Sequence, residues 1–353
     1  MFDYYRPCEG AEFKNAIRAL VECKYFPALA AHLYPQQFVE EVKQMFLSFE
    51  DVYQFQHVVM RRGCEWVVEN TMDQFTFSGV EYLDGRPCLF VSNHRDIVLD
   101  AMMLQYILVN HGLDTSYVVV GANLFEMDMM RLLARTNKMY DICRGGTARE
   151  YYKSLMEMSQ FLRHQVTQCG ASAWIAQRNG RTKDGNDRTD PALIKMIAAS
   201  GDRQDPVAAL NAMHIVPVSV SYEWEPCGIY KARELFLRQQ GPYTKADGED
   251  TQSVLHGITD YKGRVHFAIC PPLTSDEVAA QDGFEAVAQL IDQRISQHYH
   301  LWPNNHIAKA MLEGQECSLP EASRFRQYVA DASTSYPPEF RRILLGIYAN
   351  AIP

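Results

Sequence analysis

Pro87-Cys-Leu-Phe-Val-Ser-Asn-His-Arg-Asp-Ile-Val-Leu-Asp100 is the stretch that decides the fold. Its first half, residues 87–92, is a short and mostly apolar run of the kind that forms a buried strand. A polar cluster at residues 92–96 follows at once and opens a segment that is typical of a helix as far as residue 110. Ligands of α/β sheets bind at the carboxyl ends of the strands. The polar cluster is therefore the first candidate for a functional site.

The same alternation of apolar runs and helical patterns continues along the chain. Further strand-like runs are residues 75–83, 117–121, 171–176, 215–222 and 263–269. Helical spacing of apolar residues occupies residues 127–135, 147–168 and 191–200. Strands that alternate with helices predict an α/β fold with a mostly parallel central sheet flanked by helices.

The two ends of the chain have a different pattern. Apolar residues recur at helical spacing from residue 11 to about residue 75, which predicts a small N-terminal helical cap. Helical patterns return after residue 275. We therefore expect an N-terminal helical region at 1–75, an α/β domain at 76–275 and a C-terminal helical extension at 276–353 that packs on the core.

Composition and charge narrow the class of protein. Of 353 residues, 47% are hydrophobic, which is enough for a sizeable core and excludes disorder of the whole chain. The formal net charge of −9 argues against nucleic acid as a partner. The nine cysteines include no Cys-x-x-Cys pair, and neither a secretory signal nor a long apolar run is evident. We expect a cytoplasmic protein with reduced thiols, and peripheral contact with the inner face of the membrane as a further expectation.

His94 is the strongest candidate for catalysis. Asp96 and Asp100 both follow it closely, and a carboxylate beside an imidazole fixes its tautomer and stabilises the imidazolium of a general base. The competing interpretation is that this cluster only caps the following helix. His94-Arg-Asp-Ile also resembles the catalytic loop of protein kinases, but the asparagine that this loop requires is replaced by Ala101.

Two further stretches have the composition of anion sites. Arg144 precedes a glycine pair and Thr147 can cap the next helix, so free amides and a guanidinium could face a phosphate. Residues 176–189 follow a strand-like run and are rich in Arg, Lys and Gly. Each stretch taken alone is equally typical of an ordinary turn or of a solvated charged loop.

Taken in order, these stretches resemble the glycerophosphate acyltransferase superfamily. That family has an Asn-His block with a downstream Asp, an Arg after a strand, a glycine-rich block with Arg, and a strand containing Pro. The chain carries these blocks as Asn93-His94 with Asp100, Ile142-Cys143-Arg144, Asn179-Gly180-Arg181-Thr182-Lys183-Asp184-Gly185, and Ile215-Val216-Pro217-Val218. Tyr222-Glu223 and the later Tyr230-Lys231-Ala232-Arg233-Glu234-Leu235 are similar to the glycerol-3-phosphate acyltransferase branch.

The resemblance implies roles for particular residues. It implies a general base at His94, with Asp100 or Asp96 as its partner. It implies a substrate-binding set of Asn93, Arg144, Gly180, Arg181, Thr182, Lys183 and Pro217. Two departures stand out. Four residues separate the family Asp from its His, which puts that Asp at the position of Leu99 in this chain, and the usual Glu of the third block is replaced by Arg178 or Asn179. We prefer Asp100 as the partner because the family Asp lies inside the following helix.

The activity implied by the resemblance is direct acyl transfer. A thioester, either acyl-CoA or acyl carrier protein, would donate a fatty acyl group to a hydroxyl of glycerol 3-phosphate or a lysophospholipid. No metal and no cofactor beyond that co-substrate is expected. Two alternatives stay open from the sequence: a catalytically degenerate acyl- or lipid-binding protein of the same fold, and a thioesterase in which His94 activates water.

Contact with a lipid surface is expected at one of two places. One is the N-terminal helical cap. The other is the stretch around Met127, Met129, Met130, Leu132 and Leu133, where Arg131 and Arg135 are interleaved as in an interfacial helix. The competing interpretation of the second stretch is that its apolar residues are core positions of an amphipathic helix.

Overall fold

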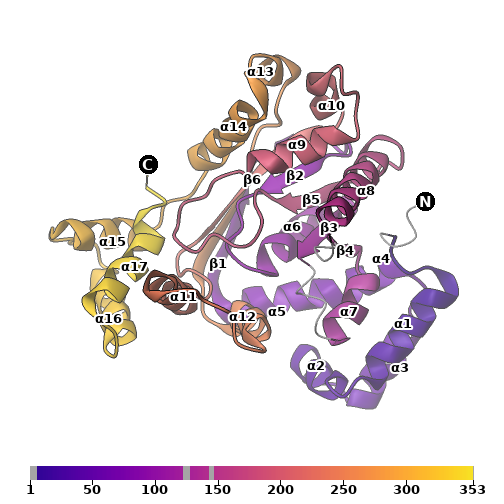
Figure 1. Cartoon of the computed structure of the whole chain (residues 1–353). Helices are drawn as coiled ribbons and strands as arrows, with labels where there is room; N and C mark the ends of the chain where they lie inside the picture. The colour runs from indigo at the N-terminus through magenta and orange to yellow at the C-terminus, as the bar shows by residue number, and fades with distance from the viewer. Residues whose placement is uncertain (1–5, 122–127, 143–146, 353) are drawn as a thin grey trace.

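Seven strands between residues 72 and 269 form one central sheet (Figure 1). The structure is a computed structural model and describes residues 6–121, 128–142 and 147–352. The strands are β1 Met72–Ser78, β2 Leu89–Ser92, β3 Tyr117–Gly121, β4 Met139–Ile142, β5 Ala173–Ala176, β6 Ile215–Tyr222 and β7 Gly263–Ile269. Their order across the sheet is β1-β7-β6-β2-β5-β3-β4. Every pairing except β6 with β7 is parallel, so the predicted α/β fold with a mostly parallel sheet is confirmed.

Strand β2 lies in the middle of the sheet, between β5 and β6. All four of its residues are buried, as expected for a parallel strand covered on both faces. Ser92 at its end is in register with Ala176 of β5 and Val218 of β6. The three strands therefore end at the same edge of the sheet. The turns that follow β2 and β5 meet there.

Helices cover both faces of the sheet (Figure 1). One face packs against α8 (Ala148–Thr167), α9 (Pro191–Ala199) and α14 (Gly283–Gln297), with the short α10 (Pro206–Asn211) and α13 (Ser275–Ala279) beside them. The other face packs against α5 (Arg61–Thr71), α6 (Leu99–Asn110) and α12 (Glu249–Thr259). The helices α10, α11 (Gly228–Gln240) and α12 were not expected from the sequence patterns. Helix α10 lies between α9 and β6 in the chain, and α11 and α12 lie between β6 and β7.

The N-terminal helices form a cluster with its own apolar core. They are α1 (Gly10–Glu22), α2 (Phe26–Leu33), α3 (Val39–Ser48) and α4 (Val52–Phe55), and a π-helical turn at Gln56–Met60 joins α4 to α5. Helix α7 (Asp128–Arg135) packs against α1. Leu132 and Leu133 are half-buried in this contact, so these two residues serve as packing positions rather than as an exposed lipid-facing stripe.

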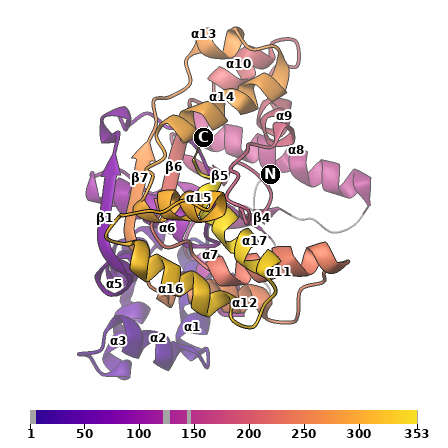
Figure 2. The same cartoon turned by 90° about the vertical axis from the view of Figure 1, so that its left-hand side faces the viewer.

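The C-terminal helices are α15 (Pro303–Glu313), α16 (Ala322–Ser333) and α17 (Pro338–Ala349), and they pack together with α11 (Figure 2). Their end reaches the loop after β5, where the side-chain amide of Asn350 donates to the carbonyl of Asp184 at 2.8 Å. Gly185 in that loop has φ +82°, and a Cβ there would lie 2.3 Å from the carbonyl oxygen of Ile347. Only glycine fits this close approach. Among the described residues, no helix is long and apolar enough to cross a membrane.

Candidate active site

The turn after β2 is organised around one buried carboxylate, that of Asp100 in the first turn of α6. Its Oδ2 accepts from Nδ1 of His94 at 2.9 Å, and from the backbone amides of Arg95 at 2.6 Å and Asp96 at 2.9 Å. Its Oδ1 accepts from the hydroxyl of Tyr222 at 2.8 Å. All four contacts of this fully buried carboxylate are with hydrogen donors. Asp100 is therefore held as an acceptor.

This environment decides the state of the His94 ring. Because the oxygen of Asp100 accepts, Nδ1 of His94 carries the hydrogen and Nε2 of the neutral ring presents a lone pair. The side chain is 13% exposed, and among the described residues no group hydrogen-bonds to Nε2. The ring of Trp174 lies edge-on at 5.9 Å between centroids, and the indole N–H of Trp174 donates to Ser92 at 3.0 Å. The imidazole is oriented from two sides and keeps one free basic nitrogen.

Asp96, the other candidate partner, has a different task. Its Oδ1 accepts from the backbone amides of Val98 and Leu99, both at 2.9 Å, and so satisfies the first amides of α6. Its side chain is 1% exposed, and among the described residues it forms no hydrogen bond with His94. Five residues separate His94 from Asp100. Asp96, within that interval, caps α6, and the carboxylate of Asp100 is hydrogen-bonded to the imidazole. The structure thus pairs His94 with Asp100.

The side-chain amide of Asn93 is hydrogen-bonded within the protein. The side chain is fully buried, and its oxygen accepts from the backbone amide of Val220 at 2.7 Å. Its nitrogen donates to the carbonyl of Val220 at 2.9 Å and to Asp187 at 2.8 Å. These hydrogen bonds join the turn to β6 and to the loop after β5, and the role of Asn93 in substrate binding stays a prediction.

The loop after β5 (residues 177–190) lies directly against residues 93–96, which form the His94 turn. The amide of Thr182 donates to the carbonyl of His94 at 2.7 Å, and the amide of Gln177 donates to the carbonyl of Ser92 at 2.8 Å. Asp187 makes the main side-chain link: its Oδ2 accepts from Nε and Nη2 of Arg95 at 3.0 and 2.8 Å. The predicted base and the predicted anion loop are therefore one connected unit.

A buried network of charges supports that unit. Arg95 is 1% exposed and also donates to Glu225 at 3.3 Å, while Nζ of Lys231 donates to Glu225 at 2.6 Å and to the carbonyl of Arg95 at 2.5 Å. Burial by itself lowers the pKa of Arg95, but Asp187 and Glu225 outweigh it and raise that pKa well above its usual value. No sequence pattern indicated a role for Arg95, Asp187 or Glu225. A buried Arg needs carboxylate partners, but their identity is decided only by the fold.

The predicted anion-binding residues fall in different environments. Gly180 is exposed and has φ +76°. Arg181 is half-buried, and its Nη1 is buried without a hydrogen-bond partner among the described residues. Thr182 is fully buried, and its hydroxyl likewise has no partner in the described part of the chain. Lys183 forms an ion pair with Glu234 of α11, and burial lowers its pKa although Glu234 opposes that shift. Arg181 is therefore the residue of this set whose charge is least committed.

Two other expected residues are placed differently. Pro217 lies inside β6 opposite Val91 of β2, and its carbonyl accepts from the amide of Cys270 at 2.9 Å. It is a buried sheet residue, and its contact with substrate stays a prediction. Arg144 lies outside the residues that the structure describes.

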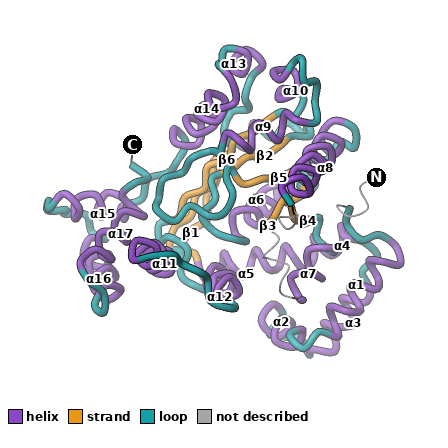
Figure 3. Tube along the Cα trace, viewed as in Figure 1, coloured by secondary structure: helices purple, strands orange, loops and turns teal. Residues whose placement is uncertain are grey.

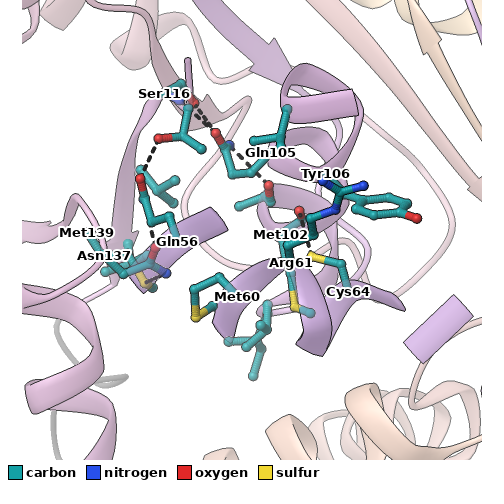
Figure 4. Close-up of a pocket in the computed structure, with 17 residues that line it drawn as sticks. Gln56, Met60, Arg61, Cys64, Met102, Gln105, Tyr106, Ser116, Asn137 and Met139 are labelled. Carbon is teal, nitrogen blue, oxygen red and sulfur yellow. Dashed lines mark hydrogen bonds between the residues drawn. The ribbon is translucent and has the colours of Figure 1, made fainter. Parts of the chain in front are cut away.

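A cavity lies between α5, α6 and β3 (Figure 4). It measures about 670 Å³ together with its open mouth. Ile97 and Val98, which directly follow the His94 turn, line it, together with the π-helical turn, α5, α6, β3 and the start of β4. Its apolar lining includes Met60, Ala101, Met102, Val109, Val118, Val120 and Met139. Gln56, Gln105 and Asn137 lie in the polar part of the wall, where Gln56 donates to Asn137 at 2.8 Å.

Among the described residues, no group of three or more His, Cys, Asp or Glu side chains could hold a metal ion. Cys64 lines the cavity, but burial raises the pKa of its thiol far above the usual value, so it remains a neutral thiol.

Comparison with known proteins bears on the same region. Residues 74–221 match the family model described as Acyltransferase, and this range holds the His94 turn and the loop after β5. A search of curated proteins found no match. Among solved structures, the chain is similar to the crystal structure of the 1-acyl-sn-glycerophosphate (LPA) acyltransferase PlsC from Thermotoga maritima. The identity is 13%, 80% of this chain and 96% of that chain are covered, and the TM-score is 0.41. The family match confirms the resemblance found in the motif blocks.

Proposed function

We propose that this chain, whose residues 74–221 form an acyltransferase-family domain, moves a fatty acyl group from a thioester to a hydroxyl of glycerol 3-phosphate or a lysophospholipid. The observation that carries the proposal is the His94–Asp100 pair with Nε2 of His94 left free. A neutral imidazole oriented by a buried carboxylate is the arrangement that a general base needs.

The reaction that fits this site is a single displacement. Nε2 of His94 takes the proton of the acceptor hydroxyl as its oxygen attacks the thioester carbonyl carbon. The tetrahedral intermediate then collapses, the carbon–sulfur bond breaks, and the imidazolium returns its proton to the departing sulfur. Asp100 stabilises the imidazolium between these two transfers. His94 holds the proton between the two transfers. Because the acceptor oxygen attacks the thioester carbon directly, the proposed reaction requires no covalent acyl-enzyme.

The loop after β5 is the proposed place of the acceptor's phosphate. Nη1 of Arg181 and the hydroxyl of Thr182 are buried polar groups without described partners, and they belong to the loop whose Thr182 amide donates to the carbonyl of His94. A phosphate held there would lie in the loop that contacts the base. Positioning of this kind can contribute several kcal/mol to catalysis.

The cavity lined by Ile97 and Val98 is the proposed place of the fatty acyl chain. Its walls are mostly apolar, as suits a fatty acyl chain. Because these two residues directly follow the His94 turn, a chain in the cavity would keep its thioester carbon near the base.

The test is acceptor-dependent release of thiol from acyl-CoA by the purified chain, with glycerol 3-phosphate and lysophosphatidate tested separately. We expect thiol release to require one of these acceptors and to fall at least a hundredfold in His94→Ala. Thiol release without acceptor would favour the thioesterase alternative. Acyl-CoA binding without any turnover would favour the degenerate binding protein. Parallel assays with acylated carrier protein identify the donor.

We also propose peripheral contact with a lipid surface through the N-terminal helices. Phe38 before α3 is 79% exposed and Tyr25 before α2 is 50% exposed, and the ammonium of Lys24 lies 4.9 Å from the Tyr25 ring centroid. Aromatic residues beside a base favour the interface of a bilayer. Flotation with anionic vesicles should recover the chain, and Phe38→Ser should reduce the recovered fraction. Equal flotation of wild type and variant would remove this surface.

A further inference from the structure

Tyr222 is the donor to Asp100 that comes from outside the His94 turn. It is the last residue of β6, and the turn follows β2, the adjacent strand. Its hydroxyl donates to Oδ1 of Asp100 at 2.8 Å, while Nδ1 of His94 donates to Oδ2. The two oxygens of one carboxylate thus connect Tyr222 and His94. The other donors to this carboxylate are backbone amides of the turn itself.

The phenol of Tyr222 is held as a hydrogen donor. The residue is 1% exposed, and burial together with the negative charge of Asp100 raises its pKa well above the usual value. Its hydroxyl therefore stays protonated at neutral pH. A side chain this deeply buried does not reach a substrate, so any effect on the reaction must pass through Asp100.

We propose that Tyr222 is a positioning residue that fixes the carboxylate of Asp100 and moderates its pull on the His94 proton. The inference rests on the proposed function of His94. A hydrogen bond to Oδ1 draws charge away from Oδ2, so Asp100 attracts the imidazolium less strongly than an unshared carboxylate would. The role differs from that of the backbone donors, because a side chain can be removed without changing the turn.

Removing this hydroxyl has a defined sign. Without the Tyr222 donor, more negative charge rests on Oδ2, the imidazolium of His94 is favoured, and the pKa of His94 rises. Other charged or titratable groups around the cluster are Arg95 and Asp96 in the turn, Glu225 after β6 and Tyr299 after α14. All four remain in Tyr222→Phe, so a change measured in that variant reports on the hydroxyl.

The experiment is an NMR titration of the His94 ring in the wild-type chain and in Tyr222→Phe, alongside the pH profile of kcat. We expect the pKa of His94 to rise by about half a unit and kcat at its plateau to fall about tenfold, with both KM values within about twofold. The matched control is Tyr348→Phe, which removes another buried hydroxyl whose oxygen accepts from the amide of Glu225 at 3.2 Å. This control should leave the His94 titration unchanged.

An unchanged His94 titration in Tyr222→Phe would overturn the inference. If that variant fails to fold, replacement of Tyr222 by 3-fluorotyrosine keeps the shape and strengthens the donor, and the pKa of His94 should then fall. The NMR readout needs no turnover. A shifted titration in a chain whose His94→Ala variant retains activity would therefore refute the proposed function and leave the Tyr222 contact standing.

Discussion

The turn that carries His94 and the loop that follows β5 touch each other, yet they differ in how completely their polar groups are satisfied. In the turn, both oxygens of Asp100 are occupied by four donors, and Asn93 uses its oxygen and nitrogen in hydrogen bonds. The exception is Oδ2 of Asp96. In the loop, several buried polar atoms have no partner in the described part of the chain: Oε1 and Nε2 of Gln177, Nη1 of Arg181, Oγ1 of Thr182 and Oδ1 of Asp187.

The His94 turn is held by hydrogen bonds within the protein, whereas the loop after β5 has buried polar groups that a ligand or water can bond. A buried polar group without a partner costs about 1–3 kcal/mol, so a folded protein keeps such groups only where something fills them. The groups around the base are therefore held by the fold itself, whereas these loop groups keep capacity to hydrogen-bond a ligand or water. Variants of the two regions should differ accordingly, and the following predictions test that difference.

The largest difference in kcat is expected between variants of Asp100 and variants of Asp96. Asp100→Asn removes the negative charge that stabilises the imidazolium and turns one of the two acceptor oxygens into a donor, so kcat should fall at least a hundredfold. Asp96→Asn keeps an oxygen for the amides of Val98 and Leu99, so kcat should change no more than a few-fold. Steady-state kinetics of both variants decide the matter. An equal loss in both would mean that Asp100 has no special relation to the base.

Asp187 joins the two regions, so its loss should affect both. Asp187→Asn removes a charge from a buried cluster and leaves Arg95 with Glu225 as its remaining ion pair. Breaking such a pair costs up to about 3–5 kcal/mol, and the thermal midpoint should fall clearly. Below that midpoint, kcat should decrease and the acceptor KM should rise together. A change confined to one of these kinetic constants would show that the turn and the loop are energetically independent.

Arg181 should act on binding rather than on the chemical step. A hydrogen bond to a charged group contributes about 1.5–3 kcal/mol, so Arg181→Ala should raise the acceptor KM tenfold or more and leave the acyl-CoA KM nearly unchanged. Arg188→Ala, an exposed arginine of the same loop, is the matched control and should change neither. A raised acyl-CoA KM in Arg181→Ala would instead assign the loop to the phosphates of the donor.

The smallest effect is expected in the cavity. Ala101 in α6 is 8% exposed and lines the cavity, and Ala101→Leu would fill part of its volume. We expect a few-fold loss of kcat/KM with long acyl-CoA donors and little change with short ones. A competition assay with donors of mixed chain length measures this directly. An unchanged preference would place the acyl chain elsewhere.

The sequence alone was sufficient for the alternation of strands and helices, the mostly parallel sheet and the position of His94 at a strand end. These depend on local periodicity and on the order of elements, and the family match to residues 74–221 agrees with them. Helices α11 and α12 were not predicted, because their inward faces are set by contacts with the His94 turn. Lys231 of α11, for example, is 2% exposed although lysine is ordinarily a surface residue.

Only the tertiary structure decided which groups meet at the site. Sequence spacing left Asp96 and Asp100 as competing partners of His94, and the path of the turn resolved this geometrically by giving Asp96 to the helix amides. Asp187 lies 94 positions after Asn93, to which it is hydrogen-bonded, and Tyr222 lies 128 positions after His94. The physical reason is that hydrogen bonds at a sheet edge depend on which strands are neighbours. Strand order is a property of the whole packed chain, and no local pattern encodes it.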